Sequence, residues 1–514
     1  MQKFMEKFAL RSPVLASLEE ELATPESYEH WQQLAAQHDR LSGAEEWRRD
    51  PVSRLYDHAN IELRLQQLRR LRRKHDDHGL LFVLNEGIHG NMDGMGKPQL
   101  YLRAKCGTKK LIEDYITEIC DALEYLAPRD FKTIPWAERI EFFQRASHCY
   151  GRSALMLSGG GTLAYFHLGV LKALIEHGLC PAVISGASGG AFVAAIVGTR
   201  TEQEFLDLFK DNQLARTLTA NPDSIKIGFG RNSKVDMDAV KREMRRLIPD
   251  MTFLDAYRKT GRSINITISP AEPRQTSRLL NHIASPHVTV LSAVMASSAL
   301  PGVFAPVQLE AHNAAGEIRP YLPSRRWIDG SFSQDLPAKR LGRMYGINHF
   351  IVSQVIPGLG KEPNTRPGMR QITRDSMVAV TKEVMRGSLD WIQRRTRVGP
   401  RVGTTMNALN SLIDQQFVGD INIFPGYGMS NLSMILKMLS EEEMAHLIKA
   451  GERATWPKIP VIGMTTRIGR TLDGILHEFE LSEAHWLRVA RRPHGTHHKD
   501  GKAARSRRTR RIAS

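Results

Sequence analysis

The chain has 514 residues, 41% apolar and 25% charged, a composition typical of a folded globular protein with two or three structural units. Its four cysteines show no C-x-x-C spacing, so they suggest neither a disulfide framework nor a zinc site, and a reducing compartment fits best. The formal net charge is +16, and the segment after Pro493, with two lysines and five arginines against one aspartate, supplies about +6 of it. Such charge suits anionic lipid or nucleic acid.

Residues 1–150 predict a helical domain. Apolar residues recur at steps of three and four over 28–41 and 53–74, the period of an amphipathic helix. The second segment is also rich in arginine and lysine, which fits either a contact with a membrane surface or a solvated helix face. The glycine-rich stretch 87–98 predicts a loop.

A strand, a glycine turn and a helix are predicted next. The apolar run 154–158 ends in Gly159, Gly160 and Gly161, and a helical pattern follows over 162–177. Glycines leave the backbone N–H groups of a turn bare. At the start of a helix, such groups favour negative charge.

A serine turn follows the second predicted strand, 181–185. The sequence there is Gly186-Ala187-Ser188-Gly189-Gly190, a G-x-S-x-G pattern, and an apolar helix follows over 191–197. The pentapeptide alone also fits a flexible loop. A strand before it and a helix after it are, however, the context of a nucleophile elbow, in which flanking glycines allow a cramped turn that presents the serine hydroxyl.

Strands alternate with helices from 151 to about 354. This alternation predicts an α/β fold with a mainly parallel sheet covered by helices. Further candidate strands are 263–269 and 349–355, and 288–300 predicts an interior helix. No transmembrane helix is expected, because serines and prolines interrupt the most apolar stretch, 288–309. The N-terminus lacks the pattern of a secretory signal.

The remaining chain predicts helices and then disorder. Helical patterns cover 377–393, and a capping box at Ser440 opens a helix to about Ala450. Basic and polar residues dominate after Arg491. We therefore expect four segments, which are an N-terminal helical domain (1–150), an α/β catalytic domain (151–356), a helical C-terminal extension packed on the catalytic domain (357–490) and a disordered basic tail (491–514).

The elbow and the glycine turn supply two of the three parts that acyl transfer needs, which are a nucleophile, a base and donors for the oxyanion. Ser188 is the candidate nucleophile. The first strand should lie beside the strand of Ser188, so that N–H groups of the glycine turn can point to the same spot. The expected oxyanion donors are the N–H groups of Gly159, Gly160, Gly161 and Gly189.

Asp329 is the candidate base. It ends a short apolar run and precedes Gly330, and Asp-Gly is also a common turn dipeptide, so a plain turn residue is the alternative. A carboxylate with a solution pKa of about 4 is a poor base in water. Removal from water and a hydrogen bond to Ser188 alone would raise its basicity. The predicted site is therefore largely dry, as a lipid-binding cleft would be.

Two other chemistries fit parts of the pattern. A Ser-His-Asp triad would need a late histidine, for which His349, His446, His477 and His485 are available, none on a strand-end glycine loop. His167, on the helix after the glycine turn, fits a packing role. The segment 159–164 also matches the dinucleotide pattern G-x-G-x-x-G/A, but the next strand ends without the acidic residue that would hold a ribose.

The glycine turn, the elbow and Asp-Gly, in this order, resemble the patatin-like phospholipase family, whose members use a Ser-Asp dyad without histidine. The resemblance implies that Ser188 is the nucleophile, Asp329 the proton acceptor and 159–161 the oxyanion turn. Two positions depart from the family pattern. Leu163 stands where a basic residue is usual, and Ser331 stands where glycine or alanine usually follows Asp-Gly.

Both departures resemble the branch of intracellular triacylglycerol lipases found on lipid droplets in fungi and plants. The similarity spans roughly 60–460 and includes motifs outside the predicted catalytic domain, at 80–101, 299–304, 329–337 and 451–457. Some relatives carry an H-x-x-x-x-D acyltransferase motif, but no histidine here has an aspartate five residues later.

We therefore expect a serine acylhydrolase of lipid esters, with triacylglycerol as the first candidate substrate. The alternatives are a phospholipase A or lysophospholipase and, outside the enzymes, a non-catalytic lipid-binding protein. No metal or cofactor is implied. The expected partners are a lipid ester and a membrane or lipid-droplet surface rather than nucleic acid, and the expected location is cytoplasmic with peripheral attachment to lipid.

Overall fold

A computed structural model describes most of the chain. The described residues are 13–128, 130–210, 213–214, 217, 237–272, 275–300, 304–330, 337–355, 419–426 and 439–490, with backbone alone for 237 and 481–490. The predicted helix at 377–393 and the predicted disordered tail at 491–514 lie outside these residues.

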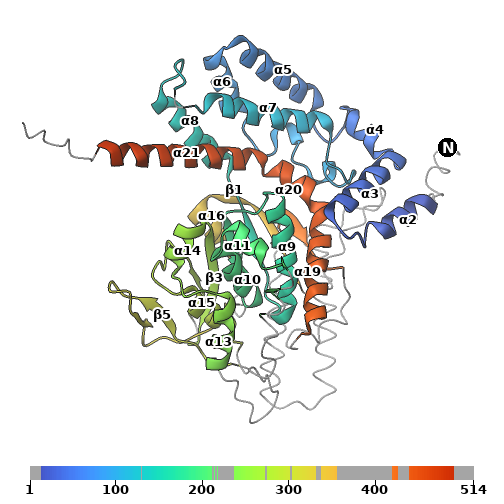
Figure 1. Cartoon of the computed structure of the whole chain (residues 1–514). Coiled ribbons are helices and arrows are strands. Elements are labelled where there is room, and N and C mark those ends of the chain that lie inside the picture. Colours follow the sequence, from blue (N-terminus) through green and yellow to red (C-terminus); the bar gives the residue numbers. More distant parts are fainter. Residues whose placement is uncertain are drawn as a thin grey trace, which may run out of the picture.

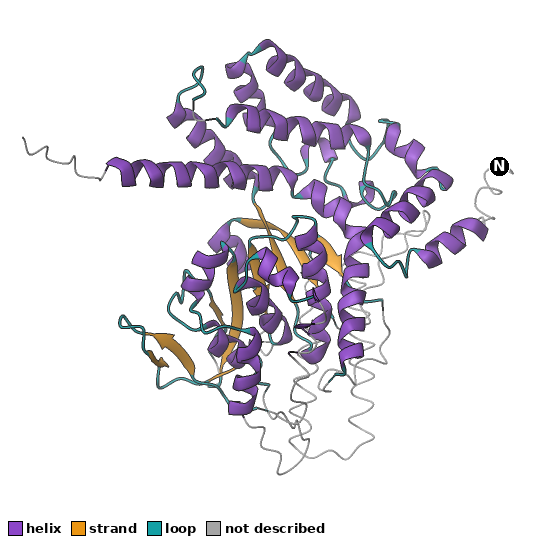
Figure 2. Cartoon of the chain, viewed as in Figure 1, coloured by secondary structure: helices purple, strands orange, loops and turns teal. Residues whose placement is uncertain are grey.

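A mainly parallel sheet forms the centre of the molecule (Figure 2). Within the described residues it has seven strands in the order β4-β3-β2-β1-β8-β9, with β7 also paired to β3. The pairs among β1, β2, β3, β8 and β9 are parallel, and β4 and β7 are antiparallel to β3. The strands are β1 (Arg152–Leu157), β2 (Val183–Gly186), β3 (Ser263–Pro270), β4 (Arg278–Leu280), β7 (Trp327–Asp329), β8 (Ile347–Ser353) and β9 (Ile421–Ile423).

The predicted α/β fold is thus confirmed, and burial explains why the strands form. All eight residues of β3 and all four of β2 are buried, as expected for strands covered on both faces. The covering helices and the small outlying hairpin are η3 (Gly161–Ala164), α9 (Tyr165–Glu176), α10 (Gly189–Gly198), α11 (Glu202–Asp207), α13 (Met237–Leu247), α14 (Phe253–Thr260), α15 (Val290–Ser297), α16 (Ala338–Tyr345), β5 (Leu309–His312) and β6 (Ile318–Tyr321).

The N-terminal region is helical and has its own apolar core. It lies beyond the end of the sheet at which β1 begins (Figure 1). Its elements are α2 (Pro13–Glu21), α3 (Tyr28–Leu41), α4 (Ala44–Arg49), α5 (His58–Lys74), α6 (Asp77–Gly87), η1 (Met92–Gly94), η2 (Pro98–Leu100), α7 (Lys110–Leu126) and α8 (Trp136–Tyr150).

The basic helix α5 begins later than the sequence predicted, because the Asp57 carboxylate accepts a hydrogen bond from the N–H of Asn60 and caps it there. Part of its charge is neutralised within the fold. The Nε atoms of Arg69 and Arg72 lie 3.4 and 2.8 Å from the carboxylate oxygens of Glu118 on α7. Several other basic side chains near the end of this helix are exposed to solvent.

The C-terminal helices contact both regions. They are α19 (Glu441–Thr455), η7 (Trp456–Lys458), α20 (Ile459–Thr465) and α21 (Arg467–Ala490). Helix α19, which opens with the predicted capping box at Ser440, packs along α9 of the sheet region. Helix α21 instead places Ile468, Leu472 and Phe479 in the apolar core of the N-terminal helices.

The expected segment 357–490 therefore differs in two ways from a helical extension on the catalytic domain. Strand β9 of this segment joins the central sheet beside β8, and α21 belongs to the N-terminal core. The apolar side chains of α21 recur at three- and four-residue steps, so they lie on one face of the helix and pack against the N-terminal helices. Among the described helices, none is both long enough and apolar enough to cross a membrane.

Candidate active site

Ser188 occupies a sharp turn between the last residue of β2 and the first residue of α10. Its backbone angles are φ +52° and ψ −122°, a combination that non-glycine residues rarely adopt. The turn is tight, and the glycines at 186, 189 and 190 leave room for the close backbone approaches that it requires. A Cβ built on Gly186 would lie 2.3 Å from the carbonyl oxygen of Gly190. A tight turn between a strand and a helix is the setting in which a serine hydroxyl can be presented to a substrate.

The glycine turn after β1 touches this elbow. A Cβ built on Gly189 would lie 2.5 Å from the carbonyl oxygen of Gly161, and one on Gly190 would lie 2.4 Å from that of Leu157. Gly160 and Gly161 have φ angles of +151° and +56°, which favour glycine. The structure thus brings together the two turns that the sequence predicted to be neighbours.

Backbone N–H groups are available at this meeting point. Gly189 is the first residue of α10 and Gly161 the first residue of η3. The first N–H groups of a helix have no acceptor within the helix, and the helix dipole adds positive potential there. A developing oxyanion between the two turns would therefore face donors from both.

Strand pairing places Asp329 on the same edge of β3 as the elbow. Ile266 pairs with Gly186 of β2 and with Leu280 of β4, so β2 and β4 lie on opposite edges of β3. Ile268 pairs with β4 and with Asp329. Strand β7 must then lie on the edge that β2 occupies.

Asp329 consequently lies just beyond the end of β2. Its partner Ile268 is two residues after Ile266, the partner of Gly186, which corresponds to about 7 Å along the strand. Ser188 also follows Gly186 by two residues. The nucleophile and base candidates therefore occupy neighbouring positions at the carboxyl end of β2, and Asp329 is only 1% exposed.

One residue of this region was not predicted from the sequence. Ser297, the last residue of α15, is fully buried, and its Oγ accepts a hydrogen bond from the N–H of Ser188 at 2.9 Å. The sequence predicted an interior helix here and gave no role to its serines. Only the contact across 109 positions of the chain identifies this hydroxyl.

His167 lies beneath the glycine turn. It is fully buried, and its Nε2 lies 3.0 Å from the carbonyl oxygen of Ser158, while its Nδ1 lies 2.7 Å from the Oγ of Ser353. Because a carbonyl can only accept, Nε2 carries the proton and Nδ1 accepts from the Ser353 hydroxyl. Burial lowers the pKa of His167 to about 4. The predicted packing role is thus refined to a neutral, hydrogen-bonded support of the turn.

The histidines proposed for a triad lie elsewhere. His349 pairs with Ser153 at the amino end of β1 and hydrogen-bonds the Ser153 hydroxyl, about 13 Å along the strand from Leu157. His446 and His477 are exposed on α19 and α21. The side chain of His485 lies outside the described residues. No described histidine from this set accompanies Ser188.

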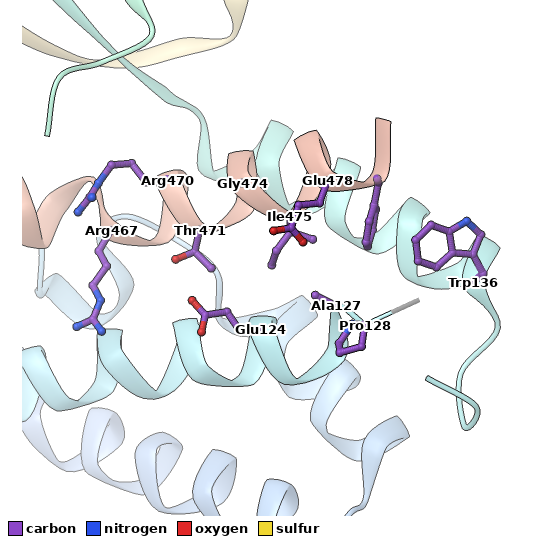
Figure 3. Close-up of a pocket in the computed structure, with 11 residues that line it drawn as sticks. Glu124, Ala127, Pro128, Trp136, Arg467, Arg470, Thr471, Gly474, Ile475 and Glu478 are labelled. Carbon is purple, nitrogen blue, oxygen red and sulfur yellow. The ribbon is translucent and has the colours of Figure 1, made fainter. Parts of the chain in front are cut away.

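A cavity of about 680 Å³ opens far from these turns, between α7, α8 and α21. Figure 3 shows Trp136 at one end of it and Arg467 at the other, with Glu124 between them. None of its lining residues belongs to the elbow, the glycine turn or β7. Its position at the N-terminal core separates it from the candidate active site.

Comparison with known proteins gives two family matches. Residues 155–341 match the model described as patatin-like phospholipase, and residues 12–148 match a domain of unknown function, DUF3336. The crystal structure of VipD from Legionella pneumophila aligns with a TM-score of 0.30 and 14% identity over 63% of this chain and 67% of that chain.

Curated relatives are similar over most of the chain. Triacylglycerol lipase ptl2 of Schizosaccharomyces pombe is 31% identical over 490 residues, which cover 88% of this chain and 77% of the relative. Triacylglycerol lipase SDP1L of Arabidopsis thaliana is 30% identical over 87% of this chain and 57% of its own length. For triacylglycerol lipase 4 of Saccharomyces cerevisiae the values are 33%, 85% and 50%. The chain therefore belongs to the patatin-like phospholipase family, a family of lipid ester hydrolases.

Proposed function

We propose that this protein is a serine acylhydrolase that cleaves triacylglycerol with Ser188 as the nucleophile and Asp329 as the base. The observation that carries the proposal is the pairing of β7 with β3 on the same edge as β2, just beyond the end of β2. That pairing supports direct contact between a strained serine turn and a carboxylate removed from water.

The proposed reaction has two halves. The Ser188 hydroxyl attacks the ester carbonyl and gives its proton to Asp329, and the resulting oxyanion accepts hydrogen bonds from the glycine-turn N–H groups and from Gly189. Asp329 then returns the proton to the departing diacylglycerol alkoxide, which leaves an acyl-enzyme. Water attacks that acyl group and gives a proton to Asp329. The bond from the acyl carbon to the Ser188 oxygen then breaks, and Asp329 returns the proton to that oxygen as the fatty acid departs.

Burial of the carboxylate supports its role as a base. Asp329 is 1% exposed, and a carboxylate removed from water binds a proton more readily than one in solution. A carboxylate with a low pKa is too weak a base to deprotonate an alcohol. The dry setting would also admit an acyl chain and exclude competing water.

The substrate class is inferred from the relatives. Three of them bear the name triacylglycerol lipase and resemble this chain over at least 85% of its length. The family description instead names phospholipases, which makes a phospholipase A or lysophospholipase the alternative. A non-catalytic lipid-binding protein is the further alternative, and retention of both Ser188 and Asp329 opposes it.

We also propose that the enzyme works at a lipid surface to which it attaches peripherally from the cytoplasm. Triacylglycerol is insoluble in water, so a hydrolase has to meet it at an interface. A net charge of +16 favours an anionic interface such as a membrane or a phospholipid-coated droplet.

The test compares wild type with Ser188→Ala and Asp329→Asn on a short-chain ester, triolein and phosphatidylcholine. Both variants should lose at least about 10³-fold in kcat, the order of loss for removal of a nucleophile or base, with Ser153→Ala on the same sheet as an unaffected control. Hydrolysis of triolein in preference to phosphatidylcholine supports a triacylglycerol lipase, and the reverse supports a phospholipase. Equal turnover in wild type and Ser188→Ala would refute the proposed chemistry.

A further inference from the structure

The hydroxyl of Ser297 joins the elbow to the central sheet. Its Oγ accepts from the N–H of Ser188 at 2.9 Å and donates to the carbonyl oxygen of Thr267 at 2.8 Å. Ser297 is fully buried, so no water competes for either bond. A single hydroxyl thus connects the backbone of the candidate nucleophile with strand β3.

Thr267 occupies the gap between two paired segments of β3. Strand β2 pairs as far as Ile266, and β7 begins to pair at Ile268. A Cβ built on Gly330 would lie 2.2 Å from the carbonyl oxygen of Thr267, so the residue after Asp329 is packed against the same carbonyl. The hydroxyl of Ser297 therefore spans the junction between the nucleophile side and the base side of the site.

This junction needs an additional restraint because the elbow is strained. Residues in sparsely populated backbone conformations keep them only when surrounding contacts fix them. The bond from the Ser188 N–H fixes the plane of the peptide that precedes Ser188. That plane determines in which direction the Ser188 side chain leaves the turn.

We infer that Ser297 is a positioning residue, whose hydroxyl holds the Ser188 turn at the distance and orientation from which Asp329 can accept its proton. The inference rests on the proposed Ser188–Asp329 chemistry. Ser297 itself touches neither substrate nor the transferred proton. Its loss should therefore slow the chemical step and leave substrate binding nearly unchanged, since small misplacements of reacting groups cost large factors in rate.

Ser292 provides a matched control on the same helix. It is also a buried serine of α15, at 2% exposed, and its Oγ donates to the carbonyl oxygen of Thr289 and accepts from the N–H of Glu310. Ser292→Ala thus removes a buried hydroxyl that bonds to the backbone, as Ser297→Ala does, and in addition a hydrogen bond from the Thr289 hydroxyl. The two variants differ in whether the lost bond reaches Ser188.

The experiment measures kcat and KM on a soluble short-chain ester, together with the rate at which a fluorophosphonate probe modifies Ser188. For Ser297→Ala we expect a loss of about 10- to 100-fold in kcat and in the modification rate, with KM within about twofold of wild type. Ser292→Ala should keep the wild-type values. Ser297→Thr, which retains a hydroxyl, should recover most of the lost rate, and Ser297→Cys, which offers only a weak donor and acceptor, should fall between.

Wild-type kcat in Ser297→Ala, or an equal loss in Ser292→Ala, would overturn the inference. Should Ser297→Ala fail to fold, Ser297→Cys decides, because it nearly preserves side-chain volume, and a wild-type kcat in that variant would be equally decisive against it. Failure of the proposed function is seen separately in the wild-type protein, as absent turnover or absent modification of Ser188. An active wild type with an indifferent Ser297 refutes only the positioning role.

Discussion

The backbone of Ser188 is unusual even among non-glycine residues with positive φ. His75, for example, has φ +54° and ψ +34° at the end of α5, which is an ordinary left-handed helix cap. Ser188 combines φ +52° with ψ −122°, a conformation that costs about 1–3 kcal/mol. The fold accepts this cost at the residue that we propose as the nucleophile, and contacts such as the bond from its N–H to Ser297 offset it.

His167 makes the stability of the fold depend on pH. Burial lowers its pKa from 6.5 in the unfolded chain to about 4 in the folded protein, so between these values the unfolded state binds a proton that the folded state rejects. The contribution is fully present above pH 6.5 and is lost as pH falls through about 4. The total loss is about 3 kcal/mol.

The measurement is thermal unfolding of wild type and His167→Gln between pH 8 and pH 4.5. Glutamine retains a donor and an acceptor but does not titrate. We expect wild type to be the more stable protein at pH 7.5 and its advantage to shrink steadily below pH 6.5. Carboxylates titrate in both proteins and drop out of the difference. Parallel Tm curves across this range would contradict a buried neutral histidine.

Helices α9 and α19 approach so closely that each needs a glycine at the crossing. A Cβ built on Gly169 would lie 1.8 Å from the carbonyl oxygen of Ile448, and one on Gly451 would lie 2.1 Å from that of Phe166. Backbone atoms cannot yield as the end of a side chain can. Helix α19 is thereby held against α9, which follows the glycine turn.

Gly451→Ala should therefore destabilise the protein by at least about 1–3 kcal/mol, the usual cost of forcing atoms into a packed interface. Gly474→Ala on α21 is the control, because its added Cβ would meet no heavy atom within 4 Å. Alanine there should stabilise the helix by about 0.5–1 kcal/mol. Thermal unfolding should thus show Tm shifts of opposite sign. A neutral Gly451→Ala would mean that the two helices do not pack as described.

The elements that the sequence predicted are those with a local signal. Strand β3 and the elbow follow from an apolar run and from glycines that the turn itself requires. Strands β4, β7 and β9 have three residues each, too few to show a period. They form because β3 and β8 offer free edges, which is a property of the assembled sheet.

The candidate site divides in the same way. The glycine turn, Ser188 and Asp329 were predicted as separate motifs, and each carries its own dipeptide or pentapeptide pattern. The edge of β3 that Asp329 shares with β2 could not be predicted, because it depends on the pairing of β4 on the other side. Ser297 was missed because a serine in an apolar helix can also bond within its own helix.

Two apolar cores share one C-terminal run of helices. The core around the sheet takes Met444 and Leu447 from α19, and the N-terminal core takes Leu472 and Phe479 from α21. The short helices η7 and α20 connect α19 to α21 and so link the two cores. The N-terminal helices are therefore attached to the sheet region by buried side chains as well as by the chain connection into β1.

At the scale of the whole molecule, the positive net charge is the property that would attract the protein to an anionic lipid surface. The net charge is +16, and residues 494–514 hold seven basic residues against one aspartate. Each basic residue close to an anionic bilayer contributes about 1 kcal/mol of attraction at physiological salt. We expect a variant without residues 494–514 to bind phosphatidylserine-containing vesicles at least tenfold more weakly, with a shallower dependence on salt.

Cosedimentation with vesicles of neutral and anionic composition measures this difference. A second variant, with the seven basic residues of the same segment changed to glutamine, keeps the length and removes the charge, and it should behave like the deletion. Turnover of a soluble short-chain ester should stay at the wild-type level in both, because the segment is remote in sequence from Ser188 and Asp329. Unchanged affinity for anionic vesicles in both variants would transfer the lipid contact to the body of the protein, where the outward-facing arginines of α5 would be the next surface to neutralise.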